Sequence, residues 1–220
     1  MLKEILKCQT RYNYCKICFK KIKYSFFNIL NPHRCICNHC LNELNPRFQK
    51  IQIGSIKGIG LYPYQGLIKE LLFQFKGCYD FELKDIFLEP YRLLLSLRYK
   101  NWIFVPVPSH QSADQKRGFN HVKEIIKSIG FNYYDCLIKT DNMKQSSLSY
   151  YQRKETYCYF NLKHKKNLNN KNVIIIDDVI TTGETMKTCI NLIKKLKPKK
   201  IKFLTISYSS RFESKFDERK

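Results

Sequence analysis

The sequence is poor in acidic residues and contains no long apolar run. Of its 220 residues, 18 are Asp or Glu and 40 are Lys or Arg, so the formal net charge is +22. No window approaches ~18 uninterrupted apolar residues, so a membrane-spanning helix is not expected. The first residues also lack an apolar segment followed by a small-residue cleavage site, so secretion is not expected either.

Alanine and glycine are scarce as well. Ala113 is the single alanine and there are 8 glycines, whereas residues with AT-rich codons such as Lys, Asn and Ile are abundant. Codon composition therefore accounts for part of the lysine. Glu also has an A-rich codon and is still rare, so the charge favours a polyanionic partner or an anionic membrane surface over a merely soluble basic surface. Hydrophobic residues at 44% exclude wholesale disorder.

Ten cysteines without an export signal point to a reducing compartment, the cytoplasm by default. Cys15 and Cys18 form one CxxC pair, and Cys37 and Cys40 form a second. Each pair can place two thiolates at one edge of a tetrahedron, so the spacing predicts a structural Zn²⁺ site. Four protein ligands leave no open position for catalysis. Free buried thiols are the alternative.

The second pair has neighbours that also bind metal. Cys35, His33 and His39 are near enough in the sequence to replace one of its ligands. We prefer Cys37 with Cys40 because this pair repeats the spacing of the first. The remaining cysteines show no comparable arrangement.

Composition changes near residue 50, which divides the chain into a metal-binding module (residues 1–50) and an α/β domain (residues 51–220). Apolar periodicity predicts helices over residues 65–76, 83–95, 122–129 and 186–196, and strands over residues 102–107, 173–176 and 201–206. The last strand, helix and strand form a βαβ unit, so we expect a parallel sheet. The polar, basic residues 163–171 are expected to form a surface loop.

A phosphate-binding turn follows the strand at residues 173–176. Two carboxylates, Asp177 and Asp178, are followed by a turn into a helix. The turn contains Thr181, Thr182, Gly183, Glu184 and Thr185. Backbone amides, hydroxyls and the helix N-terminus in such a turn bind phosphate. The pattern GxxxxGK[ST] is absent, which disfavours a Walker-type nucleoside triphosphatase.

The two acids beside this turn need a separate explanation, because they would repel a phosphate. A ribose diol with Mg²⁺ nearby would satisfy them. The alternatives are a helix cap with one solvated aspartate, or an unrelated Mg²⁺ carboxylate site.

The string VIIIDDVITTGETMKTCINLIKKL, residues 173–196, resembles the phosphoribosyl-pyrophosphate signature of type I phosphoribosyltransferases. Both CxxC pairs, YPYQGLIKELLFQFK, VPVPSH, KRGFNH, KQSSLSYYQR and this string occur in the order seen in the ComF/ComFC competence family. The resemblance covers residues 12–208. It implies a zinc-bearing module joined to a phosphoribosyltransferase-like domain, a parallel sheet flanked by helices, that acts in DNA uptake during natural transformation.

The resemblance also implies roles for individual residues. Asp177 and Asp178 would hold the ribose hydroxyls with Mg²⁺ and would be the catalytic pair of any transfer reaction. Thr181, Thr182, Gly183 and Thr185 would bind the 5′-phosphate; Val107, Pro108 and Ser109 match the pyrophosphate loop; Lys116, Arg117 and Gly118 match a mobile basic segment that could close on the ligand. Glu184 departs from the small residue often found there, and we expect its side chain to face solvent.

Basic residues next to aromatic ones predict binding of single-stranded DNA with little sequence preference. The basic candidates are Lys21, Lys23, Arg98, Lys100, Arg153 and Lys154. For any one of the neighbouring aromatics, such as Tyr99 or Trp102, core packing is the better interpretation. The expected partners also include DNA-uptake proteins at the inner membrane, where the charge would favour a peripheral position.

Two alternative functions remain open at this stage. One is an active phosphoribosyltransferase of nucleotide salvage, although no base-recognition segment is identified and the acceptor is unknown. The other is a nucleic-acid-binding regulator whose affinity responds to phosphoribosyl pyrophosphate.

Overall fold

A five-stranded sheet forms the centre of the protein in the computed structural model, which describes residues 13–23, 34–140, 159–163 and 168–213. The strands in sequence order are β1 (Gln49–Ile53), β2 (Ile56–Pro63), β3 (Trp102–Pro106), β6 (Asn172–Ile180) and β7 (Lys200–Tyr208). Their order across the sheet is β1-β2-β7-β6-β3. All neighbouring pairs are parallel except β1 with β2. The expected parallel sheet is confirmed, with one antiparallel edge strand.

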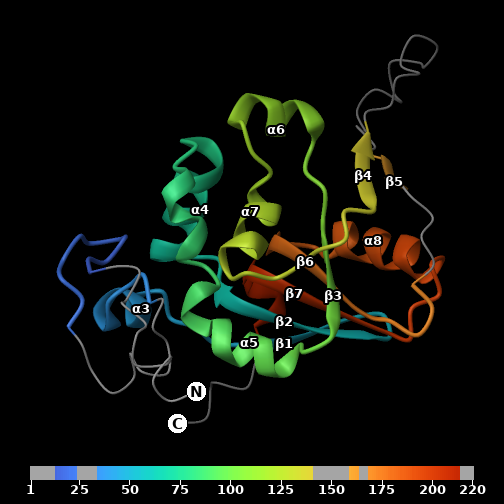
Figure 1. The fold of residues 1–220 in the computed structure, drawn as a ribbon, viewed down its shortest axis with the longest axis horizontal. Coiled ribbons are helices and arrows are strands. Elements are labelled where there is room, and N and C mark those ends of the chain that lie inside the picture. Colours follow the sequence, from blue (N-terminus) through green and yellow to red (C-terminus); the bar gives the residue numbers. More distant parts are fainter. Residues whose placement is uncertain (1–12, 24–33, 141–158, 164–167, 214–220) are drawn as a thin grey trace, which may run out of the picture.

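Helices cover both faces of this sheet (Figure 1). α4 (Gly66–Gly77), α5 (Arg92–Arg98) and α7 (His121–Ser128) bury side chains on one face, and α8 (Glu184–Lys194) buries its apolar side on the other. β6 shows the division most clearly, because Ile174 and Ile176 belong to the first core and Val173 and Ile175 to the second. A strand buried on both faces reads as a continuous apolar run, as this one does.

The helix expected over residues 83–95 is wrong as a continuous element. The chain there forms two 3₁₀ turns, η1 (Phe81–Asp85) and η2 (Glu89–Tyr91), and then α5. Pro90 lies within the second turn, where it has no N–H to donate and its ring opposes an α-helical turn before it. The apolar positions Leu83, Ile86 and Leu95 are nevertheless buried, so the pattern identified core residues but not their backbone conformation.

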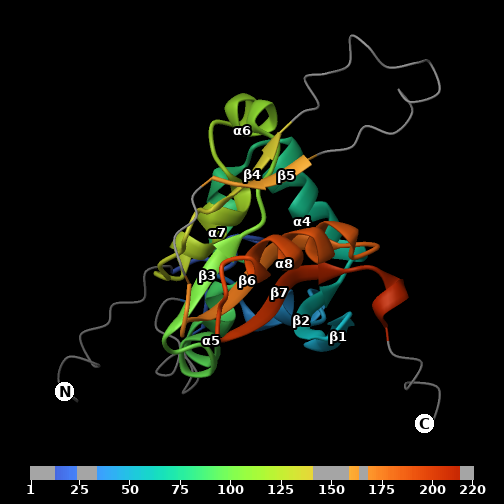
Figure 2. The same ribbon diagram turned by 90° about the vertical axis from the view of Figure 1, so that its right-hand side faces the viewer.

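A second, two-stranded sheet was not expected from the sequence. β4 (Leu137–Thr140) pairs antiparallel with β5 (Tyr159–Leu162). This pair and the short helix α6 (Gln111–Arg117) project from the same end of the main sheet (Figure 2). After β7 the chain ends its described part in the 3₁₀ turn η5 (Ser210–Phe212).

The cysteine-rich segment packs directly against the α4 face. Cys15, Cys35 and Leu44 belong to the same buried cluster as Leu61 and Phe75 of the α/β sheet and helix. α3 (Asn38–Glu43) begins within the second CxxC pair, with Cys37 at its N-cap and Cys40 inside it, and β1 begins soon after it at Gln49. The division of the chain near residue 50 stays a prediction. None of the helices in the described ranges combines the length and apolar character needed to cross a membrane.

Candidate phosphoribosyl site and cysteine cluster

The two acids lie near the carboxyl end of β6, where the parallel strands β3 and β7 also end. Asp177 is 9% exposed and Asp178 is 6% exposed, so both are buried. Because successive side chains of a strand point to opposite faces, the two carboxylates diverge. Asp178 lies on the side of α4 and α7, since its contacts come from those helices.

Asp178 is held by two cationic or polar side chains. Its Oδ2 lies 2.8 Å from Nε2 of His121, which begins α7, and it forms an ion pair with Lys76 near the end of α4. Its Oδ1 accepts the N–H of Val179 at 2.6 Å. Burial raises the pKa of Asp178, but His121 and Lys76 outweigh burial and hold that pKa well below its usual range.

Asp177 has the opposite electrostatic environment. Burial and the negative charge of Asp178 raise the pKa of Asp177 well above its usual value. The backbone N–H of Asp178 donates to Asp177 Oδ1 at 2.9 Å, which only partly opposes these effects. Adjacent carboxyl groups therefore have opposite preferences, with Asp178 ionised and Asp177 favouring its proton.

Arg117 connects the acid pair to α6. Its guanidinium donates to the backbone oxygen of Lys76 at 3.0 Å and lies 3.3 Å from Asp114 Oδ1 and 3.2 Å from Nδ1 of His121. Arginine has only donors, so Nδ1 of His121 accepts this bond. The other ring nitrogen, Nε2, faces Asp178 Oδ2 at 2.8 Å.

The loop after β3 belongs to the same network. The backbone N–H of Val107 donates to the oxygen of Ile176 at 2.8 Å, which places the loop beside the end of β6. Ser109 donates to Asp114 Oδ1, and Nδ2 of Asn120 donates to Ser109 Oγ at 2.8 Å and to Asp114 Oδ2 at 2.7 Å. These bonds fix the loop relative to α6.

The threonine-glycine turn is open to solvent. Gly183 has φ +85°, and a Cβ added there would lie 3.4 Å from Cδ1 of Ile53. Thr182 Oγ1 accepts from the N–H of Glu184 at 3.5 Å. Four of the predicted residues are exposed: Thr181, Thr182, Glu184 and Thr185. The side chain of Glu184 is 73% exposed, as expected, in the first turn of α8.

The two basic side chains of the predicted mobile segment, Lys116 and Arg117, have different environments. Lys116 is exposed, whereas the side chain of Arg117 is 8% exposed and points into the network with Asp114 and His121. Gly118 has φ 82° and ends α6. Pro108 and Ser109 line a hollow of about 350 Å³ that also borders β4.

Sequence reasoning assigned no role to Lys76, Asp114, Asn120 or His121. Each lies one to three positions from a feature that was considered, or inside a segment that carries the family resemblance, such as residues 116–121 and 62–76. The sequence could not predict the ion pair between Lys76 and Asp178, because these residues lie about a hundred positions apart. Only the fold brings them together.

The cysteine cluster can hold a metal ion such as zinc. The sulfur atoms of Cys15, Cys18, Cys37 and Cys40 all lie within 4.8 Å of one another. Cys18 Sγ and Cys37 Sγ are 3.7 Å apart. A tetrahedral Zn²⁺ with Zn–S bonds of about 2.3 Å has sulfur atoms about 3.8 Å apart, so this separation fits.

Neighbouring candidates do not join the cluster. Cys35 is fully buried outside it, and burial raises the pKa of its thiol. The side chain of His39 is 80% exposed and lies near Glu43. His33 lies outside the described residues. For Cys15, burial raises the pKa, but backbone N–H groups directed at its sulfur outweigh burial and lower the pKa to about 7.

Four of the six predicted DNA-binding residues lie in the described part of the chain, on two segments. Lys21 and Lys23 are exposed beside the first CxxC pair, and Arg98 and Lys100 are exposed at the end of α5. Arg153 and Lys154 lie outside the described residues. Tyr99 is 4% exposed and packs edge-on against Trp102 and Phe104, so it is a core residue.

Comparison with known proteins identifies the family to which this chain belongs. Residues 114–217, which include the acid pair and the turn, match the family model described as a phosphoribosyl transferase domain. Competence protein ComFC of Streptococcus pneumoniae (strain ATCC BAA-255 / R6) is 31% identical over 166 residues, which cover 73% of this chain and 73% of that protein. The chain belongs to the ComFC competence protein family.

A second ComFC protein, from Bacillus subtilis (strain 168), is 30% identical over 128 residues, which cover 57% of this chain and 53% of that relative. The match therefore spans about half of its length. A hypoxanthine phosphoribosyltransferase structure from Staphylococcus aureus is 19% identical with a TM-score of 0.39, covering 60% of this chain and 67% of that one. The strand order and the family match, rather than this low score, establish the phosphoribosyltransferase-like fold of this ComFC chain.

Proposed function

We propose that this ComFC chain acts in the cytoplasm in DNA uptake during natural transformation, binding single-stranded DNA and carrying a phosphoribosyl-pyrophosphate site. One observation supports the site above all others. A buried acid pair at the end of β6 is joined to an open threonine-glycine turn at the start of α8, inside the matched phosphoribosyl transferase region. The competence role is supported by the two ComFC relatives.

Different residues at this end of the sheet would bind different groups of the ligand. Exposed Thr181, Thr182 and Thr185, with the backbone of Gly183, would bind the 5′-phosphate at the N-terminus of α8. The acid pair would contact the ribose hydroxyls, directly or through Mg²⁺, which would supply charge neutralisation beside the carboxylates. The fixed loop of residues 107–109 would face the pyrophosphate, and Lys116 remains exposed to approach it.

The four-cysteine cluster would hold a structural zinc. Its sulfur separations suit a tetrahedral ion, and its ligands fill the coordination shell. The metal would order a segment that has little regular secondary structure and that packs against the core of the α/β domain.

Calorimetric titration with phosphoribosyl pyrophosphate and Mg²⁺ tests the ligand site. Thr185→Val should weaken binding by roughly tenfold, since it removes one hydrogen bond to a charged phosphate. Thr188→Val is the matched control, because Thr188 is also exposed and lies one helical turn further along α8. No heat with the wild-type protein, or equal losses in both variants, would overturn the assignment.

The cellular role is tested by complementation. A transformable bacterium that lacks its own ComFC protein should regain transformation with the wild-type chain and lose it again with Asp177→Ala combined with Asp178→Ala, at equal protein abundance. Full transformation by this double variant would separate the phosphoribosyl site from DNA uptake. Failure of the wild-type chain to complement would contradict the proposed role itself.

A further inference from the structure

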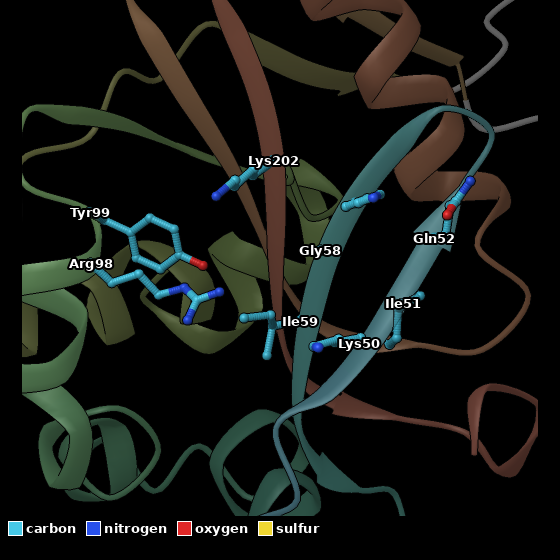
Figure 3. A pocket seen from close by; sticks show the side chains of 9 residues that line it. Lys50, Ile51, Gln52, Gly58, Ile59, Arg98, Tyr99 and Lys202 are labelled. Atoms are coloured by element: carbon cyan, nitrogen blue, oxygen red, sulfur yellow. The ribbon is translucent and has the colours of Figure 1, made fainter. Parts of the chain in front are cut away.

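A cationic groove lies on the sheet face that α5 only partly covers. Its volume is about 470 Å³, and Figure 3 shows side chains from β1, β2, β7 and the end of α5 around it. The lining residues that carry the argument are Lys50, Lys57, Ile59, Arg98, Tyr99 and Lys202. Four of these six residues are cationic.

Strand register explains why the cations gather there. Lys57 pairs with Gln52 of β1, and Ile59 pairs with Lys50, so all four side chains share one face of the β1–β2 ribbon. Gly58 pairs with Phe203, which places Lys57 beside Lys202 on the neighbouring strand. Three adjacent strands spaced about 4.8 Å apart thus carry a staggered row of lysines, in which Lys50 lies two residues along β1 from the position opposite Lys57.

Arg98 completes this row from the helix side. In Figure 3, Arg98 and Lys50 reach toward one another from opposite sides of Ile59, and Lys202 lies beside Tyr99. No carboxylate lines the groove, and in the described part of the chain none of its four cations forms an ion pair with an acid. Unneutralised positive charge in a concave, low-dielectric surface concentrates polyanions.

Aromatic rings lie beside two of the cations and also line a second hollow next to the groove. The Nζ of Lys202 lies 5.1 Å from the ring centre of Trp102, and the guanidinium of Arg98 lies 5.9 Å from that of Tyr99. A second hollow of about 260 Å³ shares Tyr99 with the first and is also lined by Lys100 and Trp102. The track therefore extends from β1 past the end of α5, longer than one phosphate group requires.

This groove is separate from the phosphoribosyl site. Lys202 is near the start of β7, whereas Ile180 beside the threonine turn pairs with Tyr208 at the end of the same strand. Six residues of strand correspond to about 20 Å. The two sites thus lie toward opposite ends of the parallel strands.

We infer that this groove binds the phosphodiester backbone of single-stranded DNA, an assignment that rests on the DNA-binding part of the proposed function. The occupant is an extended polyanion because the cations are spread along a track across four elements instead of converging on one point. Trp102 borders the track and is partly exposed, so a base could contact its ring. Binding here leaves the acid pair and the threonine turn accessible to their own ligand.

Fluorescence titration with oligo(dT) tests this inference, because Trp102 is the single tryptophan of the chain. The groove variant is Lys50→Gln with Lys57→Gln. The control is Lys194→Gln with Lys195→Gln, two exposed lysines at the end of α8 that cause the same change in net charge. Trp102 emission should change on binding, and affinity for the groove variant should fall by about tenfold at ~0.1 M salt.

The salt dependence gives the second readout. The log–log slope of affinity against salt should become less steep by about 1.4 in the groove variant, at about 0.7 per lost phosphate contact, and should stay unchanged in the control. Equal losses in both variants would overturn the groove assignment while leaving DNA binding intact. No binding by the wild-type protein at low salt would instead contradict the DNA-binding part of the proposed function, and the groove assignment with it.

Competition separates a strand from a small anion. Oligo(dT) should displace a labelled oligonucleotide at far lower phosphate concentration than inorganic pyrophosphate, because one strand contacts several cations at once. Displacement by pyrophosphate at equal phosphate concentration would overturn the assignment to a nucleic-acid strand.

Discussion

Nε2 of His121 lies 2.8 Å from Oδ2 of Asp178, and the two residues come from the start of α7 and the end of β6. With Lys76 on the same carboxylate, His121 keeps Asp178 ionised inside the protein. The neighbouring Asp177 has no such support and favours its proton. Two residues that the sequence presents as a symmetric pair therefore make unequal contributions to stability and to ligand binding.

Replacing each acid with its amide should show this inequality. Asp178→Asn removes a buried carboxylate from its contacts with His121 and with the partly exposed Lys76, so we expect a loss of about 1.5–3 kcal/mol in the free energy of unfolding. Asp177→Asn replaces a carboxyl that favours its neutral form, so this variant should show no loss of stability at pH 7. Urea unfolding at pH 7 provides the measurement. Similar losses in both variants would contradict the assigned ionisation states.

The pH dependence of stability distinguishes the acids further. Asp178 has a lowered pKa in the folded state, so its contribution is present above the unfolded value of about 3.9 and is lost as the pH falls below it. Asp177 has a raised pKa in the folded state. At a pH between about 3.9 and that raised pKa, the folded protein retains a proton that the unfolded chain releases. Stability therefore decreases as the pH rises through this range.

Asp177→Asn should remove the second effect. Relative to wild type, this variant should gain stability as the pH rises above about 4, and should show no gain at lower pH. Urea midpoints measured between pH 3 and 8, at constant ionic strength, provide the comparison. A constant difference across this range would show that the pKa of Asp177 is not raised.

Lys16 connects the first CxxC pair to the α/β domain. Its Nζ lies 2.6 Å from Oδ2 of Asp85 and 2.8 Å from Oε2 of Glu82, and the side chain of Asp85 is 3% exposed. Lys16→Met removes the ammonium group that contacts this buried carboxylate, so we expect a loss of about 1.5–3 kcal/mol in the free energy of unfolding. Lys20→Met, at an exposed position after the same CxxC pair, should change stability by less than ~0.5 kcal/mol. An equally small effect in both variants would show that the Lys16 contact contributes nothing measurable.

Metal content should separate the cysteines of the second pair from Cys35. Cys37→Ser removes one ligand of the cluster, so purified protein should contain less than one zinc per chain and should lose its thermal shift with chelator. Cys35→Ser should retain a full equivalent of zinc, because this sulfur lies outside the cluster. Elemental analysis and melting curves with and without chelator measure both. Zinc loss in Cys35→Ser alone would reverse the ligand assignment.

Several features could be predicted from the sequence because their physical causes are local. Helical periodicity identified α4, α7 and α8, and the apolar run of residues 173–176 identified the centre of β6. The two CxxC spacings identified the four cysteines of the cluster, since each short knuckle brings its own pair together. Gly183 with its positive φ and the start of α8 were also evident, because turn chemistry depends on adjacent residues.

The sequence by itself thus determined α4, α7 and α8, the strands β3, β6 and β7, the four cysteines of the cluster and the position of the acid pair. Tertiary structure alone decided the contacts between distant residues: the pairing of Asp178 with Lys76 and His121, the contact of Arg117 with His121, and the gathering of Lys50, Lys57 and Lys202 from three strands around one groove. The physical reason is sequence distance. A helix or turn depends on neighbours a few residues away, whereas ion pairs and grooves depend on strand order and register, which bring together residues up to 152 positions apart, as with Lys50 and Lys202.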